Sequence, residues 1–260
     1  MDRSPPEIFS TWLGALEARH LADLKVAELT RALRALSSAY VERRKRAATG
    51  QAVHGTLDSA GKRAAFALFY APLHFLTTYF VVQETGAAVP APGQILDLGC
   101  GTGVAGAAWS VAGGAGSSVT GIDRHPWAID EARRTYRELG VDGRARSGDL
   151  LRVPMPKAGG GIVAAFVLNE LPAALRQQVE DRLVSAAELG VRVLVIEPIA
   201  RGITPWWDET ADRFRSIGGR ADEWRIPVEL PPLLRLLDKA AGLNHRELTA
   251  RSLYCPARTP

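Results

Sequence analysis

The sequence predicts an α/β protein with a mostly parallel sheet, preceded by a helical extension. Two observations favour this fold class. Between residues 94 and 197, short apolar runs alternate with amphipathic segments, and strands that are apolar on both faces are typical of a parallel sheet covered by helices on each side. Before Pro90, apolar residues instead recur at helical spacing. We therefore expect a helical extension over residues 1–90 and a second domain over residues 91–260.

The extension is expected to contain two long helical segments. The first ends near Gly50 and has one apolar stripe, formed by Leu21, Leu24, Leu29, Leu33, Leu36 and Tyr40. The second, residues 64–83, contains no charged side chain and is about long enough to cross a bilayer. Because Pro72, His74 and two threonines lie within it, we expect a buried helix interrupted at Pro72, with His74 as a core histidine.

The second domain is expected to alternate between strands and helices. Its strands are predicted at residues 94–98, 118–123, 144–147, 162–168, 191–197 and 246–254. Its helices are predicted at residues 104–112, 126–139, from 172 onward, 206–217 and 233–241. A proline begins the second and third of these helices, which is a favoured first helical position, and Gly140 follows the second as a typical helix stop.

Composition narrows the class of protein. The chain has 260 residues, of which 47% are hydrophobic and 23% charged, as expected for a globular protein with a substantial core. Two cysteines are too few for a disulfide framework or a metal cluster, which favours a reducing cytoplasm. We therefore expect a cytoplasmic protein with no bound metal and no membrane partner. The formal net charge of +4 permits a nucleic-acid partner without establishing one.

The most informative stretch is the glycine loop that follows the first expected strand, residues 97–103 with the sequence DLGCGTG. Glycine tolerates positive φ and has no Cβ, so the backbone of such a loop can approach a ligand closely. Asp97 lies at the carboxyl edge of the sheet, where α/β proteins bind ligands. Residues 101–106 also satisfy the pattern Gly-x-Gly-x-x-Gly, and Asp123 lies at the spacing of a ribose-binding acid. The loop alone therefore leaves NAD binding open.

The stretch from Asp97 to Gly103 resembles the first motif of the class I S-adenosylmethionine-dependent methyltransferases, an acid and one residue before Gly-x-Gly-x-Gly. The resemblance implies a Rossmann-like, mostly parallel sheet of seven strands, S-adenosylmethionine as the cofactor and methyl transfer as the activity. The cofactor-binding residues that it implies are Asp97, Gly99, Cys100, Gly101, Gly103, Asp123, Arg124, Asp149, Leu150 and Asn169.

Three acids lie at or just after the ends of the first three expected strands. Asp97 would repel a pyrophosphate but attract the α-ammonium of S-adenosylmethionine, by about 1 kcal/mol in water and more where water is excluded. Asp123 could accept hydrogen bonds from both ribose hydroxyls of either cofactor, or it could cap the next helix. Asp149 follows Gly148, as in the methyltransferases, where this acid accepts from the adenine amino group. The alternative for Gly148-Asp149 is a polar turn.

Candidate catalytic residues are Asn169, Glu170 and His125. Asn169 and Glu170 follow the fourth strand, where the methyltransferase class places residues that face the substrate, although both could also simply begin a helix at Pro172. His125 is a candidate base by its residue type, or a residue at the rim of the nucleoside site that precedes the helix at Pro126. The Asn-Pro-Pro-aromatic motif of the enzymes that methylate amino groups of nucleic acids is absent from the sequence, which counts against that subclass.

A narrower resemblance is to the mitochondrial small-ribosomal-subunit methyltransferase-like family and its bacterial relatives. It depends on residues 35–40, 69–72, 168–172 and 196–198, with Gly202 beyond them, and it implies rRNA as the acceptor. The cysteine cluster of the better-known members is absent, so a small-molecule acceptor stays open. So do a non-catalytic, cofactor-binding RNA or ribosome-assembly factor and, less favoured, an NAD-dependent oxidoreductase, for which no Tyr-x-x-x-Lys pair follows the fourth strand.

Overall fold

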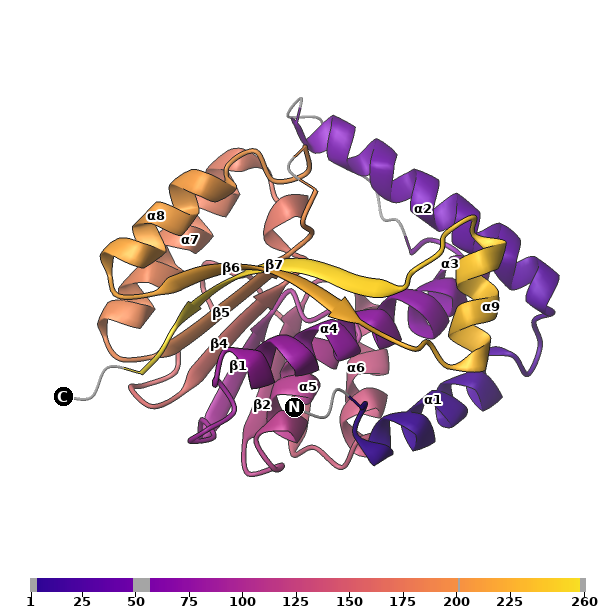
Figure 1. The fold of residues 1–260 in the computed structure, drawn as a ribbon, viewed down its shortest axis with the longest axis horizontal. Coiled ribbons are helices and arrows are strands. Elements are labelled where there is room, and N and C mark those ends of the chain that lie inside the picture. Colours follow the sequence, from indigo (N-terminus) through magenta and orange to yellow (C-terminus); the bar gives the residue numbers. More distant parts are fainter. Residues whose placement is uncertain (1–3, 49–56, 201, 258–260) are drawn as a thin grey trace.

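The computed structural model describes residues 4–48, 57–200 and 202–257. Its centre is a seven-stranded sheet with the order β3-β2-β1-β4-β5-β7-β6 (Figure 1). The strands are β1 (Gln94–Leu98), β2 (Ser118–Asp123), β3 (Gly143–Ser147), β4 (Gly161–Ala165), β5 (Arg192–Glu197), β6 (Arg220–Pro227) and β7 (Glu247–Cys255). The first five strands are parallel, and β7 runs antiparallel to both β5 and β6. This arrangement confirms the predicted Rossmann-like fold class.

The strand order reverses direction at β1. The chain moves outward from β1 to β2 and β3, then returns to place β4 on the other side of β1, so that Asp97 pairs with Gly121 on β2 and with Val163 on β4. In open α/β sheets, ligands bind at such a switch point, outside the carboxyl ends of the strands. The end of β1 and the glycine loop therefore lie where this fold binds ligands.

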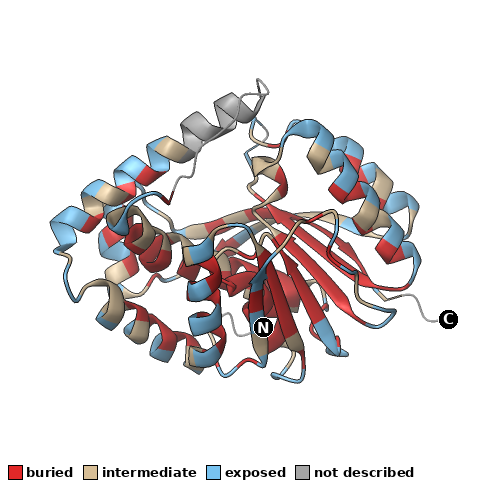
Figure 2. Cartoon of the chain, turned by 180° about the vertical axis from the view of Figure 1, so that it is seen from behind, coloured by how far each residue is buried: buried red, intermediate tan, exposed pale blue. Residues whose placement is uncertain are grey.

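Helices cover both faces of the sheet, which explains why the central strands are apolar on both sides. The sheet helices are α5 (Val104–Ala112), α6 (Pro126–Glu138), α7 (Ala173–Glu188) and α8 (Trp207–Ser216). Ile95 packs into a hydrophobic cluster with α4, α5 and α6, whereas its neighbour Leu96 packs into a second cluster with α7 and α8. The buried strands are visible between the two layers in Figure 2.

The extension consists of α1 (Glu7–His20), α2 (Val26–Ala48), α3 (Ala60–Ala65), the π-helical turn η1 (Phe66–Tyr70) and α4 (Ala71–Glu84). The expected first helix is two helices, because Leu21 and Leu24 lie in the link between α1 and α2; its expected end near Gly50 lies outside the described residues. The expected interruption at Pro72 is displaced: the helix departs from α-geometry at η1, before Pro72, which lies in the first turn of α4.

The stretch from Ala60 to Glu84 is long and apolar enough to cross a membrane, but 78% of its most apolar window is buried inside the molecule. It is therefore a core helix. The rings of Phe9 and Phe75 stack with centroids 5.4 Å apart, so α1 packs against α4. The same hydrophobic cluster includes residues of the extension and of the sheet, and whether residues 1–90 form a domain of their own stays a prediction.

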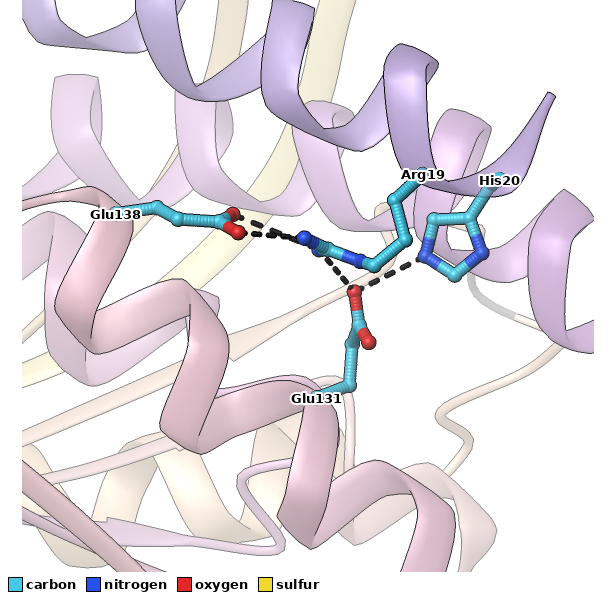
Figure 3. A network of polar contacts seen from close by, with 4 residues as sticks. All are labelled: Arg19, His20, Glu131 and Glu138. Atoms are coloured by element: carbon cyan, nitrogen blue, oxygen red, sulfur yellow. Dashed lines mark hydrogen bonds and ion pairs between the residues drawn. The ribbon is translucent and has the colours of Figure 1, made fainter. Parts of the chain in front are cut away.

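Polar contacts also attach α1 to α6 (Figure 3). Arg19 donates to Glu131 over 2.6 Å and also pairs with Glu138, while the ring of His20 lies 3.0 Å from the same Glu131 oxygen. Burial acts to raise the pKa of Glu131, but the hydrogen bonds from His20 and Arg19 outweigh it, and the pKa is lowered. The network therefore holds an ionised, largely buried carboxylate between the extension and the sheet domain.

Two elements differ from the sequence prediction. The fourth strand ends at Ala165 rather than at residue 168, because Phe166 adopts φ 58° and residues Leu168–Glu170 form a 3-10 turn, η2. The strand β6 was not expected; it is an edge strand in which most residues are exposed or half-buried and only Ile226 is fully buried. The helix α9 (Pro232–Ala240), predicted at residues 233–241, connects β6 to β7.

Candidate functional site

A cavity of about 490 Å³ lies at the switch point. Its walls include the glycine loop, the turns that follow β2, β3 and β4, and residues of η1 and α4 from the extension. Cavities of roughly 300–1,000 Å³ are typical of small-molecule and cofactor sites. The structure therefore brings most of the predicted site residues to one cavity, together with aromatic residues of the extension.

The glycine loop divides its residues between the cavity and the protein interior. Gly99 and Gly101 line the cavity, and at Gly101, with φ 52°, an added Cβ would meet only the ring of Phe66 at 3.9 Å. Gly103, also predicted to bind the cofactor, does not line the cavity. A Cβ there would lie 2.8 Å from the ring of Tyr136 on α6. Gly103 thus permits close packing of the loop against α6.

Asp97 lies at the cavity with only 1% of its surface exposed. Its Oδ2 accepts a hydrogen bond from the backbone N–H of Gly106 over 2.8 Å. Burial raises the pKa of Asp97 to about 7; the bond from Gly106 opposes this rise and the charge of Asp123 adds to it. A carboxyl that titrates near neutrality is sensitive to any cation placed beside it.

Asp123 ties the glycine loop to the turn after β2. Its Oδ2 accepts from the N–H of Gly101 over 2.9 Å, and its Oδ1 accepts from the N–H groups of Arg124 and His125 over 2.7 and 2.8 Å. The carboxylate therefore holds the turn before α6, but it does not cap the helix, whose N-cap residue is His125 and has no side-chain cap hydrogen bond. It also lines the cavity, and its two oxygens retain lone pairs that could accept from a ligand.

The turn after β3 places its residues differently from the prediction. Gly148 and Leu150 line the cavity, but Asp149 does not. The Oδ1 of Asp149 accepts from the N–H of Leu151 over 2.9 Å, and its Oδ2 lies 3.4 Å from the guanidinium of Arg124, which itself lines the cavity. The side chain of Asp149 thus makes the polar turn that was the alternative to an adenine contact.

Asn169 and Glu170, both predicted site residues, line the cavity. Asn169 is held in place by a residue that the sequence did not predict. Glu197, fully buried at the end of β5, accepts from the N–H groups of Leu168 and Asn169 over 2.8 and 3.3 Å and also from the side-chain amide of Asn169. Burial raises the pKa of Glu197 to about 8, against the effect of the hydrogen bonds from Asn169 and Leu168. The sequence signal that could have identified Glu197 is its position as an acid at the end of an apolar strand.

His125 and Thr102 contribute polar atoms without a protein partner. Both residues line the cavity. The Nδ1 of His125 and the Oγ1 of Thr102 are buried and have no hydrogen-bond partner within the described part of the chain. Buried polar atoms are rarely left unpaired in native structures, so these two fit a site that is completed by a polar ligand.

Cys100 lines the cavity with a buried thiol. Burial, together with the charges of Asp97 and Asp123, raises the pKa of this thiol well above its ordinary value. Because the thiolate is the reactive form, Cys100 serves as part of the wall and not as a nucleophile. Within residues 4–48, 57–200 and 202–257, no group of three or more His, Cys, Asp and Glu residues could hold a metal ion.

Four further lining residues are aromatic, and we call them the aromatic wall: Phe66, Tyr70, His74 and Phe166. The rings of His74 and Phe166 stack with centroids 4.0 Å apart and an interplanar angle of 16°. Phe66 and Tyr70 lie 6.3 and 6.2 Å from His74. The prediction of His74 as a core histidine is therefore corrected: its ring is well covered, but it faces the cavity because η1 and α4 form part of the cavity wall.

Part of the chain is similar to a known protein family. Residues 95–187, from β1 through most of α7, match a family described as methyltransferase domain. No curated protein matches the chain. The narrower resemblance to the ribosomal-subunit family therefore stays a prediction.

Solved structures share the fold. An O-methyltransferase family protein from Burkholderia thailandensis superimposes with a TM-score of 0.53 at 18% identity, covering 78% of this chain and 62% of that one. An O-methyltransferase from neocarzinostatin biosynthesis, solved with S-adenosylmethionine and 2-hydroxy-5-methyl naphthoic acid, gives a TM-score of 0.50 at 20% identity over 94% of this chain and 74% of that one. At these identities the likeness establishes the fold.

Proposed function

We propose that this chain is an S-adenosylmethionine-dependent methyltransferase. The observation that supports the proposal most strongly is the convergence of the glycine loop with two carboxyls, Asp97 and Asp123, on one cavity at the switch point. The domain match over residues 95–187 points to the same class. The non-catalytic RNA or ribosome-assembly alternative stays open until turnover is measured, and the buried free cysteines agree with the proposed cytoplasmic location.

The residues at the cavity fit this cofactor. Asp97 would face the α-ammonium group, Asp123 would accept from the ribose hydroxyls, and Leu150 would cover the adenine ring. Gly101 leaves room for close approach of a ligand to the backbone, whereas the space beside Gly99 is filled by the side chain of Val167. The unpartnered His125 Nδ1 and Thr102 Oγ1 offer further hydrogen-bonding positions. S-adenosylmethionine supplies, when bound, a methyl group already activated on a sulfonium.

The start of α5 argues against a dinucleotide. In dinucleotide-binding folds the pyrophosphate lies at the N-terminus of the helix after the glycine loop, where free N–H groups and the helix dipole favour an anion. Here the N–H of Gly106, in the first turn of α5, already donates to the carboxyl of Asp97. A protein acid thus occupies a position that a pyrophosphate would need, so NAD loses the support that the glycine pattern offered.

For catalysis, the chain has to position the acceptor and take up its proton, since the methyl group is activated in advance. Asn169 is held by Glu197 at the cavity and would orient the acceptor. Glu170 or His125 would accept the proton that the acceptor loses. Closure of the cavity by the extension would exclude water from the reacting atoms.

Binding of S-adenosylhomocysteine tests the proposal directly. A ligand present at 100 times its Kd stabilises the native state by about 2.7 kcal/mol, so S-adenosylhomocysteine should raise the melting temperature and NAD should not. Asp123→Ala should weaken binding in calorimetry, while Asp212→Ala, an exposed acid on α8, should bind like the wild type. Stabilisation by NAD with no response to S-adenosylhomocysteine would overturn the assignment.

A further inference from the structure

We propose that the methyl acceptor is a small, uncharged aromatic molecule, and that it packs against the aromatic wall formed by Phe66, Tyr70, His74 and Phe166. The inference rests on the proposed function, because it concerns the second ligand of the same cavity. The chemical class of that ligand is inferred from the lining residues that have no proposed role in binding the nucleoside.

The aromatic wall and the nucleoside residues come from different parts of the chain. The proposed nucleoside residues follow β1, β2 and β3, whereas Phe66 and Tyr70 belong to η1, His74 belongs to α4, and Phe166 follows β4. All four wall residues line the cavity that also contains the glycine loop. One cavity therefore combines polar, acidic and glycine residues with a set of aromatic residues, of which Phe66 comes near Gly101.

The local backbone of the wall is unusual at two places. Residues Phe66–Tyr70 form a π-helical turn inside an otherwise α-helical stretch, and such turns are frequent at functional sites. Phe166 adopts φ 58°, a conformation that bulky side chains rarely take and that persists where the surrounding structure demands it. Both departures present aromatic rings to the cavity, which favours a binding role over simple core packing.

His74 adds a neutral polar group to the wall, beside the hydroxyl of Tyr70. Its ring makes aromatic contacts with Phe66, Tyr70 and Phe166. Burial lowers the pKa of His74 to about 3, so the imidazole is uncharged at neutral pH and does not repel a cationic cofactor. A neutral imidazole can hydrogen-bond a hydroxyl or N–H group of an aromatic acceptor, while the adjacent rings favour a flat apolar body.

Charge at the cavity favours a small molecule over RNA. The lining includes the acids Asp97, Asp123 and Glu170, and the cation Arg124. Arg124 is already paired with Asp149. RNA-binding surfaces use Lys and Arg to neutralise phosphates, and the described lining offers the opposite balance. A cavity of about 490 Å³ also has the size of a small-molecule site.

The test uses the full chain with S-adenosylhomocysteine and, as probes, the uncharged hydroxyarenes phenol and 2-naphthol, the saturated analogue decahydro-2-naphthol, and a short single-stranded RNA. Saturation-transfer NMR and calorimetry measure binding, and mass spectrometry measures methyl transfer from S-adenosylmethionine. We expect a hydroxyarene to bind, and the saturated analogue to bind about tenfold more weakly, the upper range for an aromatic pair.

Variants separate the wall from the nucleoside residues. His74→Ala should weaken hydroxyarene binding several-fold while leaving the affinity for S-adenosylhomocysteine within about twofold, because it removes a wall ring only. Phe214→Leu removes a ring that is buried in the other hydrophobic cluster and should change neither affinity. His74→Phe, which restores a ring, should recover most of the binding that His74→Ala loses.

The two proposals can fail separately. No binding of S-adenosylhomocysteine would remove the proposed function and this inference with it. Binding of S-adenosylhomocysteine without binding of either hydroxyarene at millimolar concentration would overturn this inference alone. The inference would also fail by itself if the RNA bound with strong salt dependence and accepted the methyl group in place of the hydroxyarenes.

Discussion

Replacement of Asp97 by Asn should separate the stability of the protein from its affinity for a cationic ligand. Burial raises the pKa of Asp97 from an ordinary value of 3.8 to about 7. The native state therefore retains a proton that the unfolded chain has lost, and the stability of the ligand-free protein falls as the pH rises from about 4 to about 7. Asn cannot ionise, and its Oδ1 can still accept from the N–H of Gly106.

The structure sets the size of the effect. A pKa of about 7 in place of 3.8 means that burial, the hydrogen bond from Gly106 and the charge of Asp123 together disfavour the ionised carboxyl by about 4 kcal/mol. Bound S-adenosylmethionine would place a cation beside the carboxyl and favour its ionised form. Binding should then release a proton near neutral pH, and the affinity should fall by up to tenfold for each pH unit below about 7.

Calorimetry with S-adenosylmethionine tests this directly, at about pH 6 and about pH 8, on either side of the Asp97 pKa, in two buffers of different ionisation enthalpy. Comparing wild type with Asp97→Asn cancels any titration of the ligand itself. The variant should bind weakly at both pH values, release no proton through this group, and melt no lower than wild type at about pH 8. Equal affinity of the two proteins, or a variant that loses stability at high pH, would show that the Asp97 carboxylate does not hold the cation.

Three further predictions concern the surroundings of the site. Burial raises the pKa of Glu197 from 4.5 to about 8, so ligand-free stability should fall as the pH rises through this window, and Glu197→Gln should flatten the slope in thermal denaturation between about pH 7 and 8. The pKa of Glu131 is lowered from 4.5, so its ionised carboxylate should stabilise the folded protein above about pH 4.5, and this stabilisation should be lost as the pH falls below that value. Glu131→Gln should expose α1 to proteolysis at neutral pH. Protection of α1 equal to that in the wild type would contradict this. Gly103→Ala should destabilise the protein by more than about 1 kcal/mol, because its Cβ would overlap the ring of Tyr136 at a positive φ. At Gly101 an added Cβ has space, so Gly101→Ala should destabilise the protein less than Gly103→Ala does. It should weaken the binding of S-adenosylhomocysteine more than Gly103→Ala does, as measured by calorimetry.

Local signals in the sequence were sufficient for the central elements of the fold. The bounds of β1, α5 and β2 agree residue for residue with the predicted segments, and glycines on both sides mark the ends of β1 and α5 in the sequence. The strand β6 has no such signal: it is an edge strand with alternating charged residues, and it forms by pairing with β7. Its existence depends on a contact between segments distant in sequence.

The sequence predicted the site residues whose positions are determined by the backbone, and it was less successful for residues whose positions depend on side-chain packing. Asp97, Asp123 and Gly101 reach the cavity because each follows a strand that ends at the same sheet edge. Asp149 follows its strand in the same way, yet it turns to Leu151 and Arg124. This outcome depends on competing local hydrogen bonds, which spacing does not reveal.

The sequence pattern did not predict the aromatic wall, for a different reason. His74 and Phe66 lie in a long apolar stretch in which every residue is expected to be core. Only the packing of the extension over the sheet selects which of these side chains face the cavity. The positive φ of Phe166 is likewise invisible in sequence, because no glycine or asparagine marks it.

A structure of the protein with S-adenosylhomocysteine would locate the ligand relative to the two acids and the aromatic wall. It should place the ribose hydroxyls within hydrogen-bond distance of the Asp123 carboxylate and the amino group of the ligand beside Asp97, with the aromatic wall next to the sulfur. A ligand bound away from the glycine loop, or one whose ribose and amino group contact neither acid, would contradict the proposed function.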